Sequence, residues 1–247
     1  MRRSGLSGPG RLPEIDRLVS FAGGILDKTH QDLKGKKMLV TAGPTQEPID
    51  PVRYIGNRSS GKMGFAIAHA AALRGAEVTL VSGPVSLKTP RNVRRVDVDT
   101  AGAMLETVQK EFKSMDVVIM AAAVADYAPD QPSTQKIKRE ARSSDTLTVS
   151  LKKNPDILAS LGQQKKHQKL IGFALETSDG LENAKKKLAA KRLDAIVLNK
   201  ANEDGAGFGT DTNVVTIISI AGKVESLPKL PKFDVANEIL SRVAGML

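Results

Sequence analysis

The sequence predicts an α/β protein with a three-layer, Rossmann-like fold and a mostly parallel sheet. Two observations lead to this prediction. Strand-like and helix-like segments alternate from about residue 36 to the C-terminus, and several strand-like segments are continuous apolar runs, such as 117–121. Because such runs have no polar side, they indicate strands that helices cover on both faces. Right-handed crossovers are then expected between the parallel strands.

The elements follow in order along the chain. The expected strands are 37–42, 76–82, 93–98, 116–123, 146–152, 169–175, 194–199 and 214–220. Capping residues mark the helices between them. The expected helices are one capped by Ser60 that runs to Arg74 with Gly75 at its end, 101–113 capped by Thr100, 155–165 opened by Asn154 with Pro155 first, one opened by Ser178 with a Lys-rich segment at 185–192, and 233–246.

The segment before residue 36 has a different character. Residues 1–35 carry Gly, Pro and charge, with one short apolar patch over 15–25. This pattern indicates a tail or linker, so we expect one main domain over 36–247. Neither a signal peptide nor an apolar run of membrane-spanning length is recognisable, and we expect a cytoplasmic protein without a membrane partner.

Composition narrows the chemistry. The chain has 37 Lys and Arg against 27 Asp and Glu, a net charge of +10 that favours anionic partners, either nucleic acid or phosphorylated metabolites. Only 3% of residues are aromatic and Trp is absent, so the stacking surfaces of single-strand binders are missing. The absence of Cys excludes a thiol nucleophile and a Cys-type zinc site, and the three His lack ligand spacing.

A glycine-containing segment over 54–64 is the most informative stretch. Gly56 to Lys62 has the spacing of a nucleoside-triphosphate loop, but Met63 stands where Ser or Thr would hold magnesium. The G-x-G-x-x-G fingerprint is also missing after the first strand, which disfavours a nicotinamide enzyme. The segment suits an anion at a helix N-terminus, and an ordinary capped helix is the alternative.

Ligands of such sheets bind beyond the carboxyl ends of the strands, so the segments after 37–42, 116–123 and 169–175 should converge. In the first of them, three prolines stiffen a loop that leads to Arg53 and Asn57. Arg53 can bind a phosphate or carboxylate, and Asn57 can hold a carbonyl or oxyanion. A surface ion pair and a turn residue are the alternatives.

The second segment, Ala121 to Tyr127, has small side chains that would let a flat ring approach the backbone. Asp126 within it can bind ribose hydroxyls or a metal-bound water, and an Asp in a turn or cap is the alternative.

Two pairs of lysines can face a polyphosphate. Lys136 and Lys138 share one side if their segment is extended, and Lys187 and Lys191 share a helix face. A solvated basic surface is the alternative for both pairs.

Seven ordered motifs in 36–247 closely resemble the phosphopantothenoylcysteine synthetase domain of bacterial bifunctional coenzyme A biosynthesis flavoproteins. The motifs are 41–45, 50–55, 57–64, 122–127, 136–138, 153–157 and 172–177. The resemblance implies a ligase that joins 4′-phosphopantothenate to L-cysteine with CTP and Mg²⁺, through an acyl-cytidylate, with release of pyrophosphate and CMP. Such chemistry needs positioning and charge neutralisation more than a covalent nucleophile, which a Lys-rich, Cys-free site can supply.

The resemblance also implies residue roles. Lys136 would neutralise the triphosphate during activation, and Asn57 would hold the acyl-cytidylate while the amine attacks. Arg53 and Ser59 would help to hold phosphopantothenate, with a contribution from the second subunit of a homodimer. The nucleotide contacts implied are Ala123, Asp126, Lys136, Pro155, Asp156, Ile157, Leu158, Phe173, Lys187 and Lys191.

Residues 7–14 resemble the end of the partner domain, a flavin-dependent decarboxylase, whose body is absent from this sequence. We therefore expect no FMN binding by this chain. Two other functions compete with the ligase: a basic nucleic-acid-binding module, which the lack of aromatics disfavours, and a nicotinamide reductase, which the missing fingerprint disfavours. The sequence identifies no metal ligands and does not force cytosine over adenine.

Overall fold

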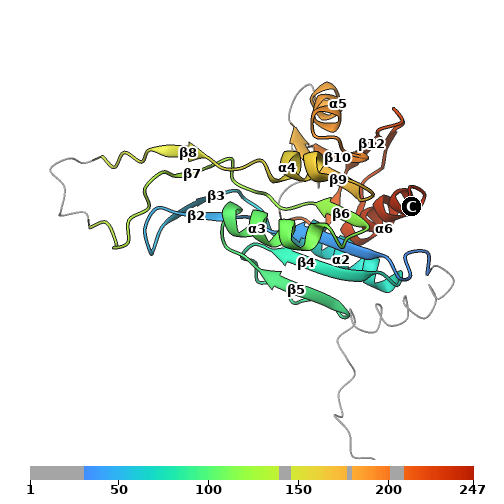
Figure 1. Cartoon of the computed structure of the whole chain (residues 1–247), viewed down its shortest axis with the longest axis horizontal. Helices are drawn as coiled ribbons and strands as arrows, with labels where there is room; N and C mark the ends of the chain where they lie inside the picture. The colour runs from blue at the N-terminus through green and yellow to red at the C-terminus, as the bar shows by residue number, and fades with distance from the viewer. Residues whose placement is uncertain (1–30, 139–145, 177–179, 201–208) are drawn as a thin grey trace, which may run out of the picture.

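The computed structural model describes residues 31–138, 146–176, 180–200 and 209–247 (Figure 1). Its main sheet contains β1 (Lys37–Ala42), β4 (Glu77–Ser82), β5 (Val93–Asp97), β6 (Val117–Met120), β9 (Lys169–Glu176), β10 (Ala195–Lys200), β12 (Val215–Ser219) and β13 (Val224–Ser226). Their order across the sheet is β13-β12-β10-β9-β6-β1-β4-β5. The strands from β5 to β10 are parallel, and β12 and β13 extend the sheet in antiparallel fashion.

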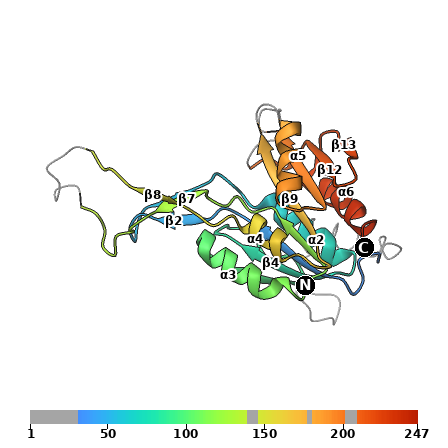
Figure 2. The same cartoon turned by 45° about the horizontal axis from the view of Figure 1, so that its top comes forward.

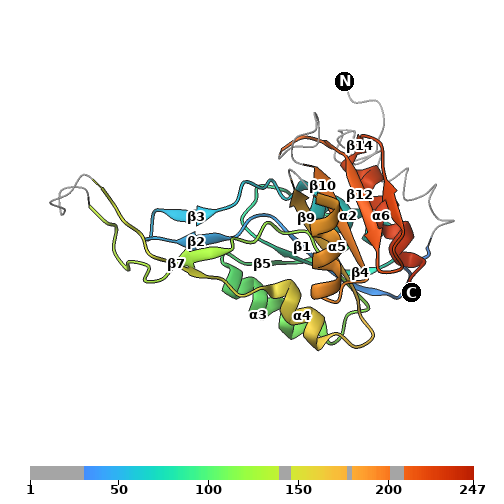
Figure 3. The ribbon, with the colours of Figure 1, turned by 90° about the horizontal axis from the view of Figure 1, so that it is seen from above.

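Helices cover both faces of this sheet (Figures 1 and 3). They are α2 (Lys62–Leu73), α3 (Ala101–Phe112), α4 (Ile157–Gln164), α5 (Gly180–Ala190) and α6 (Lys232–Ala244). The apolar sides of α2 and α6 pack on one face, and those of α3, α4 and α5 pack on the other. The predicted three-layer α/β fold is confirmed.

Alternation along the strands supplies the two halves of the core. In β1, Met38 and Val40 face the layer of α2 and α6, whereas Leu39 faces the layer of α3. All three side chains are fully buried. The continuous apolar runs of the sequence are therefore explained as predicted: helices cover both faces of the sheet, so both sides of such a strand are buried.

Two short hairpins project away from the sheet (Figure 2). One consists of β2 (Gln46–Pro48) and β3 (Tyr54–Gly56), and the other of β7 (Tyr127–Pro129) and β8 (Leu151–Lys153). We call these hairpins, residues 46–56 and the described residues of 127–153, the arm. A third pair of strands, β11 (Thr212–Asn213) and β14 (Leu230–Pro231), lies before α6.

The prediction of a strand over 146–152 was wrong. Residues 146–150 form no strand, and 151–153 pair with β7 in the arm instead of joining the main sheet. The segment was expected to be extended, but its sequence did not indicate the strand that it would pair with. The expected strand over 116–123 is also shorter, because the chain leaves the sheet after Met120.

Two helix starts also differ from the prediction. Gly61, in the left-handed region at φ 75°, precedes α2, and no side chain caps this helix, so Ser60 is not its cap. Asp156 caps α4 in place of Asn154, and the helix begins at Ile157. Thr100 caps α3 as predicted, with its side chain accepting from the Ala103 N–H. The predicted start at Ser178 lies outside the described residues.

No helix in the described ranges combines the length and the apolar character required to cross a bilayer.

Candidate functional site

The carboxyl ends of β1 and β6 are joined by main-chain hydrogen bonds. The Ala123 N–H donates to the Gly43 carbonyl at 2.8 Å, and the Thr45 N–H donates to the Ala123 carbonyl at 3.3 Å. We call residues 41–45 and 122–126 the sheet edge. It occupies the position at which doubly wound α/β proteins bind their ligands.

Two buried threonine hydroxyls hold this edge in place. The Thr41 hydroxyl accepts a hydrogen bond from the Ala122 N–H at 3.1 Å, and the Thr45 hydroxyl accepts one from the Ala125 N–H at 2.9 Å. Both threonines are 0% exposed. Because each hydroxyl satisfies an amide that leaves the sheet ladder, the loop after β6 has a fixed path.

Asn57 lies against this edge. It follows β3, and its Nδ2 donates to the Val124 carbonyl at 2.9 Å. The residue is otherwise exposed. Its Oδ1 and second N–H have no partner among the residues that the structure describes, so the amide can hold a carbonyl or phosphoryl oxygen beside Val124.

The entry to α2 lies just beyond Asn57. The Ser59 hydroxyl accepts a hydrogen bond from the Gly61 N–H at 3.3 Å. Gly64 packs so closely on β1 that a Cβ there would lie 2.6 Å from the Ala42 Cβ. The Lys62 ammonium donates to the Gly209 carbonyl and to the Asp211 carboxylate, each at 2.7 Å. It therefore points at the 209–211 segment.

Asn154 joins the segment before α4 to the sheet edge. Its Nδ2 donates to the Ala125 carbonyl at 2.9 Å, and its N–H donates to the Asp126 carbonyl at 2.8 Å. Asp126 and Pro155 are both exposed there. The structure thus brings together three segments that the sequence singled out, those of Asn57, Ala123 and Pro155.

Two of the expected nucleotide contacts bind each other. The Lys191 ammonium lies 2.7 Å from the Asp156 carboxylate. Partial burial is the largest influence on the Asp156 pKa and raises it, but hydrogen bonds from Lys191 and the Ala159 N–H, with the Lys191 charge, outweigh it and leave the pKa lowered. A polyphosphate that recruits Lys191 must therefore compete with this carboxylate.

The other expected nucleotide contacts are buried, partly buried or already engaged with a partner. Ile157 is buried, and Leu158 packs against the same side of the core. Phe173 is half-buried within β9 and packs against the opposite core cluster. Lys187 is exposed on α5 and already has an interaction partner.

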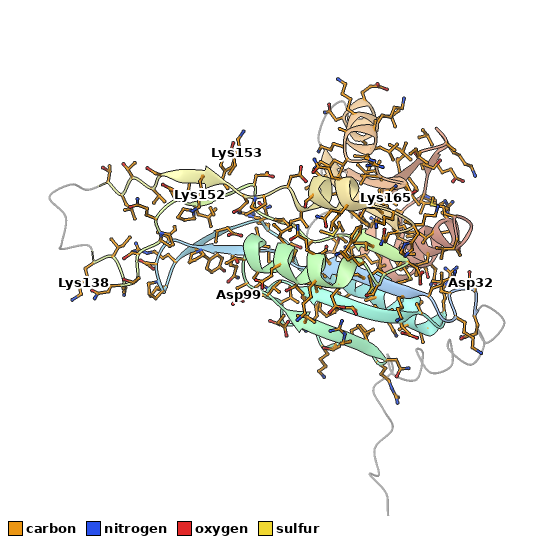
Figure 4. All side chains as sticks on the ribbon, in the orientation of Figure 1. Asp32, Asp99, Lys138, Lys152, Lys153 and Lys165 are labelled. Carbon is orange, nitrogen blue, oxygen red and sulfur yellow. The ribbon has the colours of Figure 1, made fainter. Side chains whose placement is uncertain are left out.

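Arg53 and Lys136 lie on the arm, not at the sheet edge. Arg53 is in the turn between β2 and β3, and its Nη2 donates to the Ile137 carbonyl at 2.9 Å. Lys136 is the exposed neighbour of Ile137. Figure 4 shows Lys138, two residues further on, near the outer part of the arm, while Lys152 and Lys153 lie along β8. Within one chain, Arg53 and Lys136 therefore lie in the same part of the arm, whereas Asn57 lies at its base.

The base of the arm is joined to α3. The Gln46 N–H donates to the Asp99 carbonyl at 2.7 Å, and the buried Glu47 carboxylate accepts from the Ala101 N–H at 2.9 Å. A carboxylate at a helix N-terminus also interacts favourably with the helix dipole. These contacts fix where the arm leaves the sheet.

Sequence reasoning missed three residues that organise the site: Thr41, Thr45 and Asp50. Thr41 lies within β1 and Thr45 shortly after it, and nothing in the local sequence separates either from an ordinary strand or loop residue. Asp50 had a usable signal, because an Asp just before a Pro-containing turn commonly accepts hydrogen bonds from amides two or three residues ahead.

The described residues contain no group of three or more His, Asp or Glu side chains placed to hold a metal ion.

The sheet edge, the α2 entry and the arm contain the motifs that a known family shares. A family model described as the DNA/pantothenate metabolism flavoprotein C-terminal domain matches residues 33–247. The chain belongs to this family. Its resemblance to phosphopantothenoylcysteine synthetase is thereby confirmed.

Curated relatives and a solved structure agree with this membership. The coenzyme A biosynthesis bifunctional protein CoaBC of Bacillus subtilis (strain 168) is 46% identical over 244 residues, which cover 98% of this chain and 59% of the relative. The chain thus spans less than two thirds of that protein. A cysteine/cysteine sulfinic acid decarboxylase from an unknown prokaryotic organism is 44% identical over 249 residues, 99% of this chain and 68% of the relative.

The crystal structure of the C-terminal domain of a CoaBC protein has a TM-score of 0.75 and 44% identity to this chain. The match covers 87% of this chain and 97% of that domain.

Proposed function

We propose that this chain is a phosphopantothenate–cysteine ligase of coenzyme A biosynthesis, which uses CTP and releases CMP and pyrophosphate. The observation that carries the proposal is the hydrogen bond between Asn57 Nδ2 and the Val124 carbonyl. It brings two of the family's motifs, 57–64 and 122–127, to one edge of the sheet. Membership of the family supports the class of reaction, and the sheet edge is the site at which we propose that it takes place.

The reaction proceeds in two displacements. A carboxylate oxygen of phosphopantothenate attacks the α-phosphorus of CTP, the bond to the β-phosphate oxygen breaks, and pyrophosphate leaves. The cysteine amine then attacks the acyl carbon, the bond to the cytidylate oxygen breaks, and CMP leaves while the nitrogen loses a proton to solvent. Neither step needs a covalent protein nucleophile, in keeping with a chain without Cys.

Asn57 and Lys136 divide these steps between them. The Lys136 ammonium offsets the charge that moves onto pyrophosphate in the first step. The free N–H and Oδ1 of Asn57 hold the mixed anhydride in the second, beside the Val124 carbonyl that fixes the amide. Ser59 and Arg53 bind the phosphopantothenate portion.

The nucleotide lies along the sheet edge. Hydrogen bonds within the edge leave the Ala122 carbonyl and the Val124 N–H without partners among the described residues, one acceptor and one donor that can read the edge of a base beside Ala123. Asp126 faces the ribose. Lys191, directly after α5, provides positive charge for the phosphates once it exchanges Asp156 for them, and Lys187 within α5 adds to that charge.

Magnesium fits this site as a companion of the triphosphate. Mg²⁺ commonly takes most of its ligands from phosphate and water, with one or two carboxylates from the protein. Asp126 is the exposed carboxylate at the edge that would serve, and its oxygens make no hydrogen bond to a described residue. The ion would neutralise charge on the departing pyrophosphate.

A homodimer completes the site. Large apolar side chains are exposed along the arm, namely Val52, Tyr54, Tyr127, Leu147 and Leu151. Exposed apolar surface of this extent on a projecting element favours association with a second chain. We propose that the arm of one subunit brings Arg53 to the sheet edge of the other.

Residues 1–35 are proposed to connect this domain to a flavin-dependent decarboxylase, its partner in a longer cytoplasmic protein. Preference for CTP over ATP rests on the likeness to the bacterial bifunctional enzymes. The proposal includes neither nucleic acid nor membrane as a partner.

The test is to incubate the protein with phosphopantothenate, cysteine, Mg²⁺ and each nucleoside triphosphate in turn, and to detect products by mass spectrometry. The proposal predicts phosphopantothenoylcysteine, CMP and pyrophosphate in equal amounts with CTP. Release of CO₂ from cysteine without ligation would contradict it and would support the activity named for the decarboxylase relative.

A further inference from the structure

Asp50 is a buried carboxylate at the turn of the first arm hairpin. Its side chain is 0% exposed. One oxygen, Oδ1, accepts from the N–H groups of Val52 at 2.9 Å and Arg53 at 2.8 Å. The other, Oδ2, accepts from Arg53 Nε at 3.0 Å, from Arg53 Nη2 at 2.5 Å and from the Ile137 N–H at 3.1 Å.

These five donors come from two hairpins. Val52 and Arg53 belong to the turn after β2, whereas Ile137 lies 87 residues away from Asp50 in the sequence, in the segment after β7. Ser133 of that same segment donates its N–H to the Ile49 carbonyl at 2.8 Å. Asp50 therefore lies among the contacts that tie the two hairpins together, and Lys136 directly precedes its partner Ile137.

The same contacts fix the direction of the Arg53 guanidinium. Its Nε and Nη2 are engaged by Asp50, and Nη2 also donates to the Ile137 carbonyl. The side chain remains 42% exposed, and Nη1 has no hydrogen-bond partner among the described residues. The two N–H groups of Nη1 are thus left to face an anion. Their direction is fixed, because the other two nitrogens of the planar guanidinium are hydrogen-bonded to Asp50 and Ile137.

The charge balance supports this arrangement. A carboxylate removed from water is stable only when it is paired and hydrogen-bonded. Here the hydrogen bond from Arg53, helped by the N–H groups of Val52, Ile137 and Arg53, lowers the Asp50 pKa well below its ordinary value despite the opposing effect of burial. The carboxylate therefore stays ionised at neutral pH and keeps its hold on both hairpins.

We propose that Asp50 is a positioning residue for the ligation: it orients the free Nη1 of Arg53 toward the phosphopantothenate anion and holds the Lys136 segment beside it. The identity of the substrate in this inference rests on the proposed function, whereas the contacts of Asp50 do not depend on it. It predicts that substrate binding through Arg53 depends on a residue that never contacts the substrate.

The first test measures steady-state ligation by Asp50→Asn, which keeps the size of the side chain and removes its charge. We expect the KM for phosphopantothenate to rise about 10-fold, the cost of one charge-assisted interaction. Asp130→Asn is the matched control, an exposed carboxylate of the same arm whose change should leave KM unaltered. Asp50→Glu, which restores the charge at greater length, should recover part of the affinity.

A double-variant comparison separates positioning from general destabilisation. If Asp50 acts through Arg53, the KM of Asp50→Asn combined with Arg53→Ala equals that of Arg53→Ala alone. Independent, multiplying effects on KM, or a lowered melting temperature with an unchanged KM, would overturn the proposal.

Amide hydrogen exchange tests the contacts without any substrate. Asp50→Asn replaces the oxygen that accepts from the Ile137 N–H with an NH₂ group, so protection at this N–H should be lost, and Asp130→Asn should keep it. Unchanged protection would overturn the proposal. A wild-type protein that made no ligated product would instead contradict the proposed function, and the exchange result would still decide whether Asp50 ties the hairpins together.

Discussion

The sheet edge and the arm solve the same problem, the placement of functional groups, in opposite ways. At the edge, several backbone groups of 122–126 are bonded to β1 and to the loop that follows it, including the hydroxyls of Thr41 and Thr45. On the arm, the paired strands are three residues long, and a few contacts around the buried Asp50 carboxylate tie the two hairpins together.

This difference matches the chemistry assigned to each region. A nucleotide base is read by fixed donors and acceptors, which a sheet edge supplies with little reorganisation. In the proposed function, the cations of the arm serve a site on a second chain, which suits an element that projects away from its own sheet. The comparison predicts that loss of an exposed side chain of the arm changes rate or substrate affinity with little effect on stability, whereas loss of a buried hydroxyl at the edge lowers stability.

The largest effect is expected for Lys136→Ala. Loss of the ammonium that offsets the leaving pyrophosphate should slow pyrophosphate release about 100-fold or more, with little change in melting temperature because the residue is exposed. A coupled pyrophosphate assay measures the rate. Lys152→Ala, another arm lysine that bonds the Asp130 carbonyl, is the control and should retain most of the rate. Unimpaired release by Lys136→Ala would remove the activation role.

Asn57→Ala should separate the two half-reactions. We expect pyrophosphate release to continue while formation of ligated product falls by about 10- to 100-fold, because the amide that holds the intermediate is gone. Rapid quenching and mass spectrometry should then detect accumulated acyl-cytidylate. Equal loss of both half-reactions would argue that Asn57 serves binding in general.

At the edge, Thr45→Val should lower stability. The substitution keeps the shape of the side chain but leaves the buried Ala125 N–H without its acceptor, which costs about 1–3 kcal/mol. Urea unfolding measures this change, and Thr45→Ser, which retains the hydroxyl, should show a smaller loss. An unaltered unfolding midpoint for Thr45→Val would mean that the edge is not held by this bond.

The smallest effect concerns acid stability and the arm. Because folding lowers the Asp50 pKa, its ionised form contributes stability that is complete above the ordinary aspartate value of about 4 and is lost as the pH falls from there toward the folded pKa. The wild type should therefore lose stability more steeply below pH 4 than Asp50→Asn, with a constant difference above about pH 5. Unfolding curves that stay parallel down to pH 3 would contradict this sign.

The sequence predicted the sheet better than the arm, for a physical reason. Runs such as 117–121 must be buried on both faces, and that requirement is visible locally. Strands of three residues have no periodicity to detect, so β2, β3 and β7 were missed, and the strand expected over 146–152 was assigned to the wrong sheet.

The candidate site was predictable where one segment carries its own chemistry. Asn57 and Ala123 were singled out by their motifs, and the structure brings their segments together. The bond from Ile137 to Asp50 joins residues far apart in the sequence, so no local pattern reports it. Asn154 and Asp156 flank one proline, and both are good helix caps, which is why the cap of α4 was placed two residues too early.

The most direct test of the whole account mixes two impaired variants, Arg53→Ala and Asn57→Ala. If the arm of one subunit serves the sheet edge of the other, each homodimer lacks one group in both sites, whereas a mixed dimer contains one intact site. Random exchange of subunits should then restore roughly a quarter of the wild-type ligation rate, because half of the dimers are mixed and each has one working site of two. A rate that stays at the level of the unmixed variants, after exchange is verified by native mass spectrometry, would contradict a site shared between subunits.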